Sequence, residues 1–93
     1  MSQEELYLSS VRRLISQSPI SMWLSDEKGT LIEINEPCCK LFAVSAGDAV
    51  GVYNIFEDNM VEEQGHMEAV RAVFEKGEAA VFSIDYDCSR LPY

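Results

Sequence analysis

Residues 18–42 read SPISMWLSDEKGTLIEINEPCCKLF, and they decide the fold because two apolar runs flank a short acidic turn. In the first run, residues 20–25, the apolar side chains Met22 and Leu24 alternate with other residues, which predicts a β-strand. Trp23 should then point to the opposite face of the sheet from Met22 and Leu24. The strand therefore has one face for the core and another for a neighbouring element.

The turn at residues 26–29 joins this strand to a second one at Thr30–Ile34. Asp26 can accept hydrogen bonds from its own turn, and Gly29 can take positive φ without a steric penalty. Asn35 follows the second strand and should cap a short helix, in which Glu36 and Pro37 occupy the first turn. The stretch thus predicts a hairpin followed by a helix.

The N-terminal residues predict an amphipathic helix. Ser2 and Glu5 have the spacing of a capping box, and the helix should end before Ser18-Pro19. Its apolar stripe, together with Trp23, is the predicted dimer contact: Tyr7, Val11, Leu14 and Ile15. We therefore divide the chain into a flanking helix at residues 1–17 and a domain at residues 18–93.

The second half predicts a longer helix and one more strand. Met67, Val70, Val73 and Phe74 share one helix face, and Gly77 should end that helix in the left-handed conformation. Beyond it, Phe82, Ile84 and Tyr86 alternate with polar residues, which is the pattern of a half-buried strand. The expected class is α+β.

The composition excludes several classes of protein. The 93 residues are enough for one small domain, and their net charge of −9 disfavours nucleic acid and anionic membranes as partners. The sequence has no signal peptide and no run of apolar residues that could span a bilayer, so we expect a cytoplasmic protein. Cys38, Cys39 and Cys88 lack zinc spacing and are expected to be reduced thiols.

Residues 18–42, followed by VSAGDAVG at residues 44–51, resemble the opening of a PAS domain. The markers are Ser18-Pro19, Asp26 with Gly29, Asn35, Leu41-Phe42, and Asp48 with Gly51. Residues 64–87 resemble the long helix and third strand of PAS modules in bacterial and archaeal sensor histidine kinases. The resemblance implies a five-stranded antiparallel sheet with helices over one face and a small chamber between them.

Only three of the family's five strands are expected in this chain, which would make it a fragment of a larger receptor. In the family the two absent strands lie between the first and third strands present here. We therefore expect the strand at residues 80–87 to pair directly with residues 20–25, or a second copy of the chain to complete the sheet. Residues 20–34 and 80–86 should form one layer, with the helix at residues 67–74 over its apolar side.

The residues expected to face this chamber come from both halves of the chain. They are Met22, Leu24, Ile32, Ile34, Phe42, His66, Val70, Phe74, Phe82 and Ile84. The free energy gained by burying apolar area is enough to explain these residues as a filled core. The more specific hypothesis is that they line a ligand chamber. No cofactor is identified.

Three further features of the sequence bear on possible chemistry. The resemblance allows His66, at the start of the long helix, to be compared with the haem ligand of oxygen-sensing PAS domains, although a structural or surface histidine is the more common case at a helix start. Cys38 or Cys39 could be redox-responsive at a helix start, but both also suit small apolar filler. The acidic residues at 57, 58, 62 and 63 have the spacing of a solvated helix face and not of a calcium loop.

No catalytic motif is present, so we expect no enzyme activity from this segment. The first hypothesis is a sensory or relay module, which the resemblance assigns to a sensor histidine kinase. It would act as a homodimer on downstream signalling domains of the same parent chain, by a population shift on ligand binding. The alternatives are a ligand-free dimerisation scaffold and a haem sensor using His66.

Overall fold

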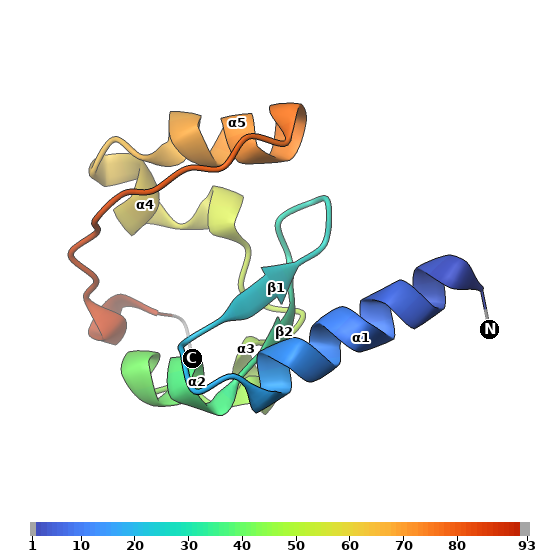
Figure 1. The fold of residues 1–93 in the computed structure, drawn as a ribbon. Helices are drawn as coiled ribbons and strands as arrows, with labels where there is room; N and C mark the ends of the chain where they lie inside the picture. Colours follow the sequence, from blue (N-terminus) through green and yellow to red (C-terminus); the bar gives the residue numbers. More distant parts are fainter. Residues whose placement is uncertain (1, 92–93) are drawn as a thin grey trace.

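The computed structural model describes residues 2–91, which contain two β-strands and five α-helices (Figure 1). This arrangement confirms the α+β class. The elements are α1 (Gln3–Gln17), β1 (Trp23–Ser25), β2 (Leu31–Ile34), α2 (Glu36–Phe42), α3 (Ala46–Ala49), the 3-10 turn η1 (Ile55–Glu57), α4 (Asn59–Glu63), α5 (Met67–Lys76) and the 3-10 turn η2 (Cys88–Arg90).

The predicted hairpin is present, with β1 antiparallel to β2. In its turn the Asp26 carboxylate accepts hydrogen bonds from the backbone N–H groups of Lys28 at 2.9 Å and Thr30 at 3.0 Å. Gly29 has φ +86°, in the region that favours glycine. The local turn chemistry therefore forms as the sequence predicts.

A register shift in the hairpin determines which side chains share a face. Trp23 lies opposite Ile34, and Ser25 lies opposite Leu31, so Ile32 is an extra residue between the paired positions. Trp23, Leu31 and Ile34 consequently point to one side of the hairpin. Leu24, paired with Glu33, points to the other.

Helix α1 covers that other side near its C-terminal end. Ser2 caps the helix by accepting a hydrogen bond from the Glu5 N–H at 3.1 Å, which confirms the predicted start. The Ile15 side chain is buried, and Arg12 Nε lies 3.8 Å from Glu33 Oε2. Ile15 is therefore internal packing and not part of a free dimer surface, which corrects one residue of the predicted contact.

Asn35 joins α1, the hairpin and α2. Its side-chain oxygen accepts from the N–H groups of Cys38 at 3.1 Å and Met22 at 3.0 Å, and its amide nitrogen donates to the carbonyl oxygens of Ile15 at 3.0 Å and Ile20 at 2.7 Å. The predicted cap of α2 is confirmed. Asn35 is also almost fully buried, with 2% of its surface exposed, so its hydrogen bonds are shielded from water.

Helix α5 forms where the apolar stripe predicts it and ends at Gly77, which has φ +67°. It does not cover the hairpin, however. Its buried residues Met67 and Val70 pack with Ile55 of η1 and Val61 of α4, and Figure 1 shows α5 above α4, away from the strands. The expected position of this helix over the sheet is therefore wrong.

The predicted strand at residues 80–87 is also absent. Within residues 2–91 the sheet has only β1 and β2, so residues 80–87 do not pair with residues 20–25. The segment runs as irregular backbone past α4 to η2 (Figure 1). Ile84 and Tyr86 are half-buried while their neighbours are exposed, so the alternation in the sequence reflects one covered face of an unpaired segment.

Candidate ligand-binding cavity

A cavity of about 190 Å³ lies on the Trp23 side of the hairpin. Its walls come from the hairpin, α2, α3, η1, α4 and the end of the chain. The lining residues are Trp23, Leu31, Ile34, Cys38, Phe42, Val44, Ala49, Tyr53, Ile55, Val61, Phe82, Ile84, Tyr86 and Leu91. None of them carries a charge, which makes this the clearest candidate for a binding site.

The hairpin forms one wall because the register shift aligns its apolar residues. Trp23 and Ile34 are direct partners across the strands, and Leu31 lies on the same face. The Trp23 and Tyr53 rings meet edge to face, with centroids 5.9 Å apart and an interplanar angle of 88°. This contact ties the strand wall to the segment that leads into η1.

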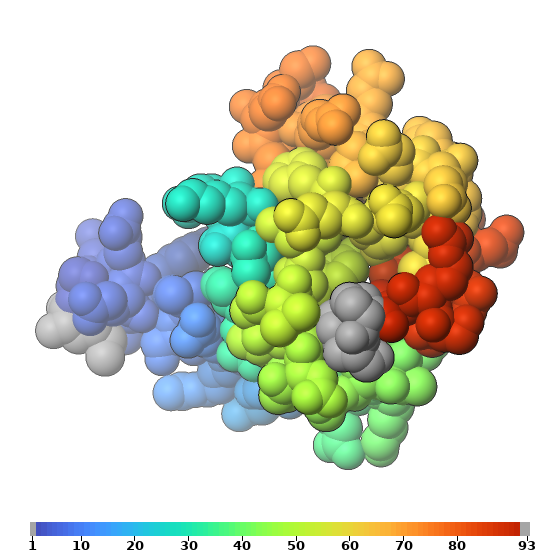
Figure 2. All heavy atoms as spheres, turned by 180° about the vertical axis from the view of Figure 1, so that it is seen from behind, coloured from blue at the N-terminus to red at the C-terminus, as the bar shows by residue number. Residues whose placement is uncertain are grey.

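The opposite wall is the C-terminal segment, which we define as residues 78–91. It contributes Phe82, Ile84, Tyr86 and Leu91 to the lining, and the Tyr86 ring packs edge to face on Phe42 with centroids 4.9 Å apart. In Figure 2 the end of the described chain lies beside α4 on one side and α2 on the other. One wall of the cavity therefore comes from a part of the chain that no β-ladder holds.

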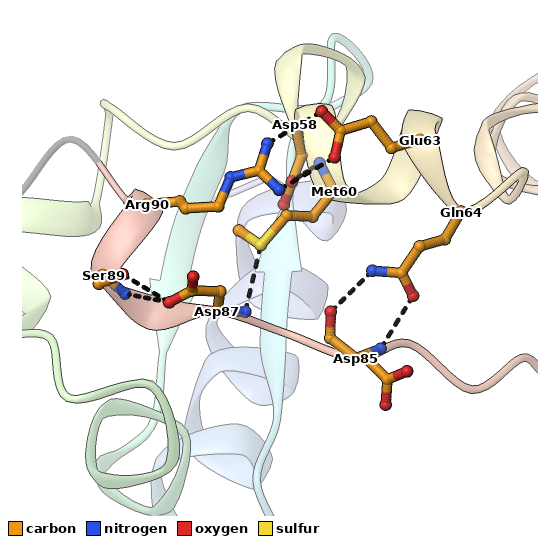
Figure 3. A network of polar contacts seen from close by, with 8 residues as sticks. All are labelled: Asp58, Met60, Glu63, Gln64, Asp85, Asp87, Ser89 and Arg90. Carbon is orange, nitrogen blue, oxygen red and sulfur yellow. Dashed lines mark hydrogen bonds and ion pairs between the residues drawn. The ribbon is translucent and has the colours of Figure 1, made fainter.

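Contacts that involve side chains attach the C-terminal segment to α4 and the residue after it (Figure 3). The Gln64 amide donates to the Asp85 carbonyl oxygen at 2.7 Å and accepts from the Asp85 N–H at 2.9 Å. The Asp87 N–H approaches the Met60 Sδ at 3.2 Å. Arg90 makes a two-pronged ion pair with Glu63, at 2.9 and 3.0 Å, at the end of the segment.

A polar cluster of two tyrosines and one carboxylate borders the cavity. Asp58 Oδ2 accepts hydrogen bonds from the Tyr53 hydroxyl at 2.7 Å and from the Tyr86 hydroxyl, and Asp58 Oδ1 accepts from the Met60 N–H at 3.0 Å. Asp58 has 7% of its surface exposed. Burial, and then the hydrogen bond to Asp58, raise the pKa of Tyr53 far above its usual range, so the phenol is neutral at physiological pH.

Cys38 lines the cavity at the start of α2, with 1% of its surface exposed. Burial raises the pKa of the Cys38 thiol, while a hydrogen bond involving Ser21 opposes that shift. A thiol held in its neutral form is a poor nucleophile. At Cys38 the structure therefore favours apolar filler over a reactive thiol.

The structure places the predicted wall residues in three different environments. Ile34, Phe42, Phe82 and Ile84 line the cavity as predicted. Met22, Leu24 and Ile32 were predicted as lining residues and are not among them. Leu24 points to the α1 side of the hairpin, and Ile32 is the extra residue at the register shift. Trp23, which the sequence places on the face opposite Met22 and Leu24, lines the cavity and keeps 37% of its surface exposed, and its predicted role as a dimer contact stays a prediction.

Val70 and Phe74 belong to a second apolar cluster. Val70 is buried with Ile55, Val61 and Met67, and Phe74 packs edge to face on Phe56 with centroids 4.7 Å apart. These residues attach α5 to η1 and α4. They are therefore core and not lining of the cavity.

His66 likewise lies outside the cavity lining. Its ring stacks on Phe82, with centroids 4.4 Å apart and an interplanar angle of 14°. A haem ligand would have to face an apolar slot large enough for a porphyrin. The described residues do not form that arrangement, so they do not fit a haem held by His66.

The acidic residues near α4 do not share one environment. Asp58 is buried in the tyrosine cluster, whereas Glu63 is exposed and a hydrogen bond from Arg90 lowers the pKa of Glu63. Between residues 2 and 91 no three His, Cys, Asp or Glu side chains come together as metal ligands. The predicted solvated face therefore holds for Glu63 and is wrong for Asp58.

Sequence reasoning missed the cluster of Tyr53, Asp58 and Tyr86. The alternating pattern at residues 82–86 predicts a strand position for Tyr86, and the local sequence indicates no polar role for Tyr53. The one available signal was the Asp58-Asn59 pair before a short helical run, since a carboxylate at a helix start accepts backbone N–H groups. That signal locates the carboxylate and says nothing of tyrosines far away in the chain.

Comparison with protein-family models, with curated proteins and with solved structures finds no match to this chain. The resemblance to PAS domains thus depends on the sequence markers alone. Across residues 2–91, every helix is too short or too polar to cross a bilayer.

Proposed function

We propose that this chain is a sensory module of a signalling protein, in which a small apolar ligand occupies the cavity beside Trp23. The observation that carries the proposal is the construction of the cavity. One wall is a hydrogen-bonded hairpin, and the opposite wall is a segment held by a small set of contacts with side chains. A ligand between the two walls would contact both.

The mechanism we propose is a population shift of the C-terminal segment. A ligand that touches Phe82, Ile84 and Tyr86 favours the arrangement in which these side chains are packed, by as much as its affinity differs between the closed and open arrangements. The position of residues 78–91 then reports occupancy to whatever follows or binds this segment. No catalytic step is involved.

We keep the PAS family as a proposal, together with its implication of a sensor histidine kinase as the parent protein. The hairpin, the Asn35 cap and the short helices after it support that assignment. The missing third strand and the position of α5 are departures from what the resemblance implies. For this reason the proposed function depends on the cavity and not on the family.

Xenon tests the cavity without assuming a ligand, because xenon binds in dry apolar cavities. We expect ¹H–¹⁵N NMR spectra under xenon gas to show shifts for the amides of cavity residues such as Ile34 and Ile84. Ala49→Leu, which fills the cavity from a buried position, should abolish those shifts. Absence of xenon binding in the wild-type protein would contradict the proposal.

Hydrogen exchange tests the relay. A saturating apolar probe such as toluene should slow exchange at Asp85, whose N–H bonds to Gln64, because the ligand favours the packed arrangement. Ile84→Ala should weaken this effect. Val81→Ala is the matched control, since Val81 lies in the same segment and is fully exposed. Binding with no change in exchange of residues 78–91 would remove the relay from the proposal.

The second candidate function is a dimerisation element, favoured by apolar residues exposed on α1. Tyr7 is 74% exposed and Leu14 70% exposed, while Val11 is half-buried and Ile15 is buried against the hairpin side. Figure 2 shows that the N-terminal part of α1 projects from the rest of the molecule. Tyr7 and Leu14, seven residues apart, lie on one side of the helix.

Sedimentation velocity tests the dimer. If α1 forms the contact, Leu14→Glu should dissociate the protein to monomers. Ser9→Glu, at an exposed position on the opposite side of the same helix, should have a smaller effect. A monomeric wild-type protein across the accessible concentration range would exclude the scaffold function.

A further inference from the structure

The C-terminal segment is held by side chains, while most of its backbone is free. The ring of Phe82 stacks on His66, and the Gln64 amide bonds to both backbone groups of Asp85. In the described part of the chain, no hydrogen bond reaches the backbone N–H or C=O groups of residues 78–84. The segment therefore has the unpaired backbone of an edge strand, although side-chain contacts already position it.

We propose that residues 79–84 dock an extended segment of another protein, one in which lysine or arginine alternates with apolar residues. The partner adds to this segment as a β-strand and pairs with its backbone groups. The site needs no ligand in the cavity, so it stands apart from the proposed sensory function. The exposure of the segment, the direction of its backbone groups and the charge around it support the proposal.

The segment is accessible where the partner would bind. Residues 77–83 are all exposed, and Val81 is 100% exposed. Phe82 lines the cavity and still keeps 37% of its surface exposed, which leaves apolar area for a partner to cover. Because contacts with α4 and α5 already hold the segment, docking orders fewer residues than it would in a free chain. The entropic cost of binding is correspondingly lower.

The free edge of the segment faces away from Gln64. The N–H and C=O groups of Asp85 both meet the Gln64 amide (Figure 3). The alternating burial of the segment indicates extended backbone, in which the two backbone groups of each residue point to the edge opposite those of the next residue. The groups of Ile84, Phe82 and Ala80 therefore point to the other edge, where a partner strand can reach them.

Charge favours a basic partner over a second copy of the chain. Residues 57–91 contain nine acidic and three basic residues, so they carry −6 of the net charge of −9. Arg90 is already paired with Glu63, whereas Glu78 and Asp85 are exposed and form no ion pair with the described residues. A second copy would bring the same negative charge to the interface, which is unfavourable. A basic strand would place cations opposite these carboxylates.

Peptides of about six residues test the docking, since that is the usual length of a strand. In ¹H–¹⁵N NMR titrations, a peptide of alternating lysine and valine should shift the amides of residues 79–84. Hydrogen exchange should slow at Phe82 and Ile84 and stay unchanged at Val81 and Ser83, because only one edge is paired. A peptide of alternating glutamate and valine should not bind. The lysine–valine peptide with every backbone nitrogen methylated should bind at least about tenfold more weakly, since it has no donors for the ladder.

Neutral variants test the choice of a basic partner. Glu78→Gln combined with Asp85→Asn should weaken binding of the lysine–valine peptide roughly threefold to tenfold, the ratio expected for two cross-strand charge pairs. The backbone bonds of Asp85 to Gln64 do not involve its carboxylate, so the segment stays in place. Glu4→Gln combined with Glu5→Gln, on α1, removes the same charge elsewhere and should have a smaller effect.

A pair of proline variants tests the direction of the edge. Ala80→Pro removes a backbone donor from the free edge, and Val81→Pro removes one from the edge that faces Gln64. Both residues are exposed and neither backbone N–H has a partner among the described residues, so the fold should tolerate both changes. Only Ala80→Pro should weaken binding of the lysine–valine peptide, by about tenfold.

Each result supports or overturns a defined part of the proposal. Equal binding of the methylated peptide, or equal affinity in the two proline variants, would show attraction by charge alone and overturn the strand pairing. Binding of the glutamate–valine peptide would overturn the basic partner. Sedimentation velocity that shows dimers which Ala80→Pro dissociates would assign the edge to a second copy and overturn it as well. Xenon binding is unaffected by any of these results, so the sensory function is tested separately.

Discussion

The Asn35 side-chain amide and the Ile15 carbonyl oxygen, 20 residues apart in sequence, are joined by a buried hydrogen bond of 3.0 Å. Ile15 lies near the C-terminal end of α1, and Asn35 lies between β2 and α2. The Ile15 carbonyl oxygen also accepts from the Ser18 N–H at the end of the helix, at 3.3 Å, so Asn35 adds a second donor to the last turn of α1. Helix α1 is therefore part of the fold at this end, although its N-terminal part projects into solvent.

Asn35→Asp should destabilise the protein strongly. The substitution keeps the oxygen that caps α2 but replaces the donor that faces the Ile15 and Ile20 carbonyl groups with a second acceptor. We expect a loss of about 1–3 kcal/mol in the free energy of unfolding, or more if the carboxylate is ionised. Urea unfolding followed by circular dichroism measures it. Asn59→Asp, at an exposed position, is the control, and an equal loss in both variants would contradict the role of Asn35.

Gly29→Ala should cost more than Gly65→Ala. Both glycines have positive φ, +86° and +80°, so either alanine carries a backbone penalty of roughly 1–2 kcal/mol. Only at Gly29 would the new Cβ also meet another side chain, with Phe56 Cδ2 at 2.6 Å. Thermal or urea unfolding of the two variants isolates that clash, and equal losses would show that Phe56 moves without cost.

Tyr53→Phe should change how stability depends on alkaline pH. The pKa of Tyr53 is raised in the folded state, so its contribution is complete below the ordinary tyrosine pKa of about 10. Above that value the unfolded state loses the proton first, and stability falls by at most about 1.4 kcal/mol per pH unit. Between about pH 8 and about pH 11, the urea midpoint should fall less steeply with pH in Tyr53→Phe than in the wild-type protein. Tyr7→Phe should retain the wild-type slope.

Cys38 should resist alkylation at neutral pH. The thiol is buried and its pKa is raised, so we expect maleimide labelling at least about tenfold slower than at the half-buried Cys88. A Cys39→Ser background removes the adjacent thiol and simplifies peptide mass spectrometry. Labelling should become equal in urea. Equal rates in the folded protein would contradict the burial of Cys38.

Local signals in the sequence predicted local structure well. The Asp26–Gly29 turn, the Ser2 and Asn35 caps and the Gly77 terminus all form where the sequence predicts them. Each depends on side chains that bond to backbone a few residues away, or on the conformational freedom of one glycine. The sequence specifies such features without reference to the rest of the molecule.

The face of the hairpin could not be predicted in the same way. Apolar residues occupy both faces of β1, because α1 covers one and the cavity lies on the other. Ile32 is an extra residue in the pairing, and a one-residue shift moves every later side chain to the opposite face. Because both faces of β1 are covered, the alternation within β1 could not show that Trp23 lines the cavity.

The C-terminal segment shows a second limit. Alternating burial at Ile84 and Tyr86 has the period of a strand, yet it requires only an extended backbone with one side covered. Whether a partner strand lies beside it depends on the tertiary arrangement. The pairing of Tyr86 with Asp58, 28 residues earlier, is equally invisible in the sequence.

The Gln64 amide meets both backbone groups of Asp85, as a neighbouring strand would at a single position. A full ladder repeats that exchange along its length, so the loss of one pair leaves the others in place. Here a single glutamine makes the whole exchange, so one substitution at residue 64 would remove it without disturbing any strand. A change of this one side chain in evolution can therefore alter how strongly the C-terminal segment is held, without altering the stability of the hairpin.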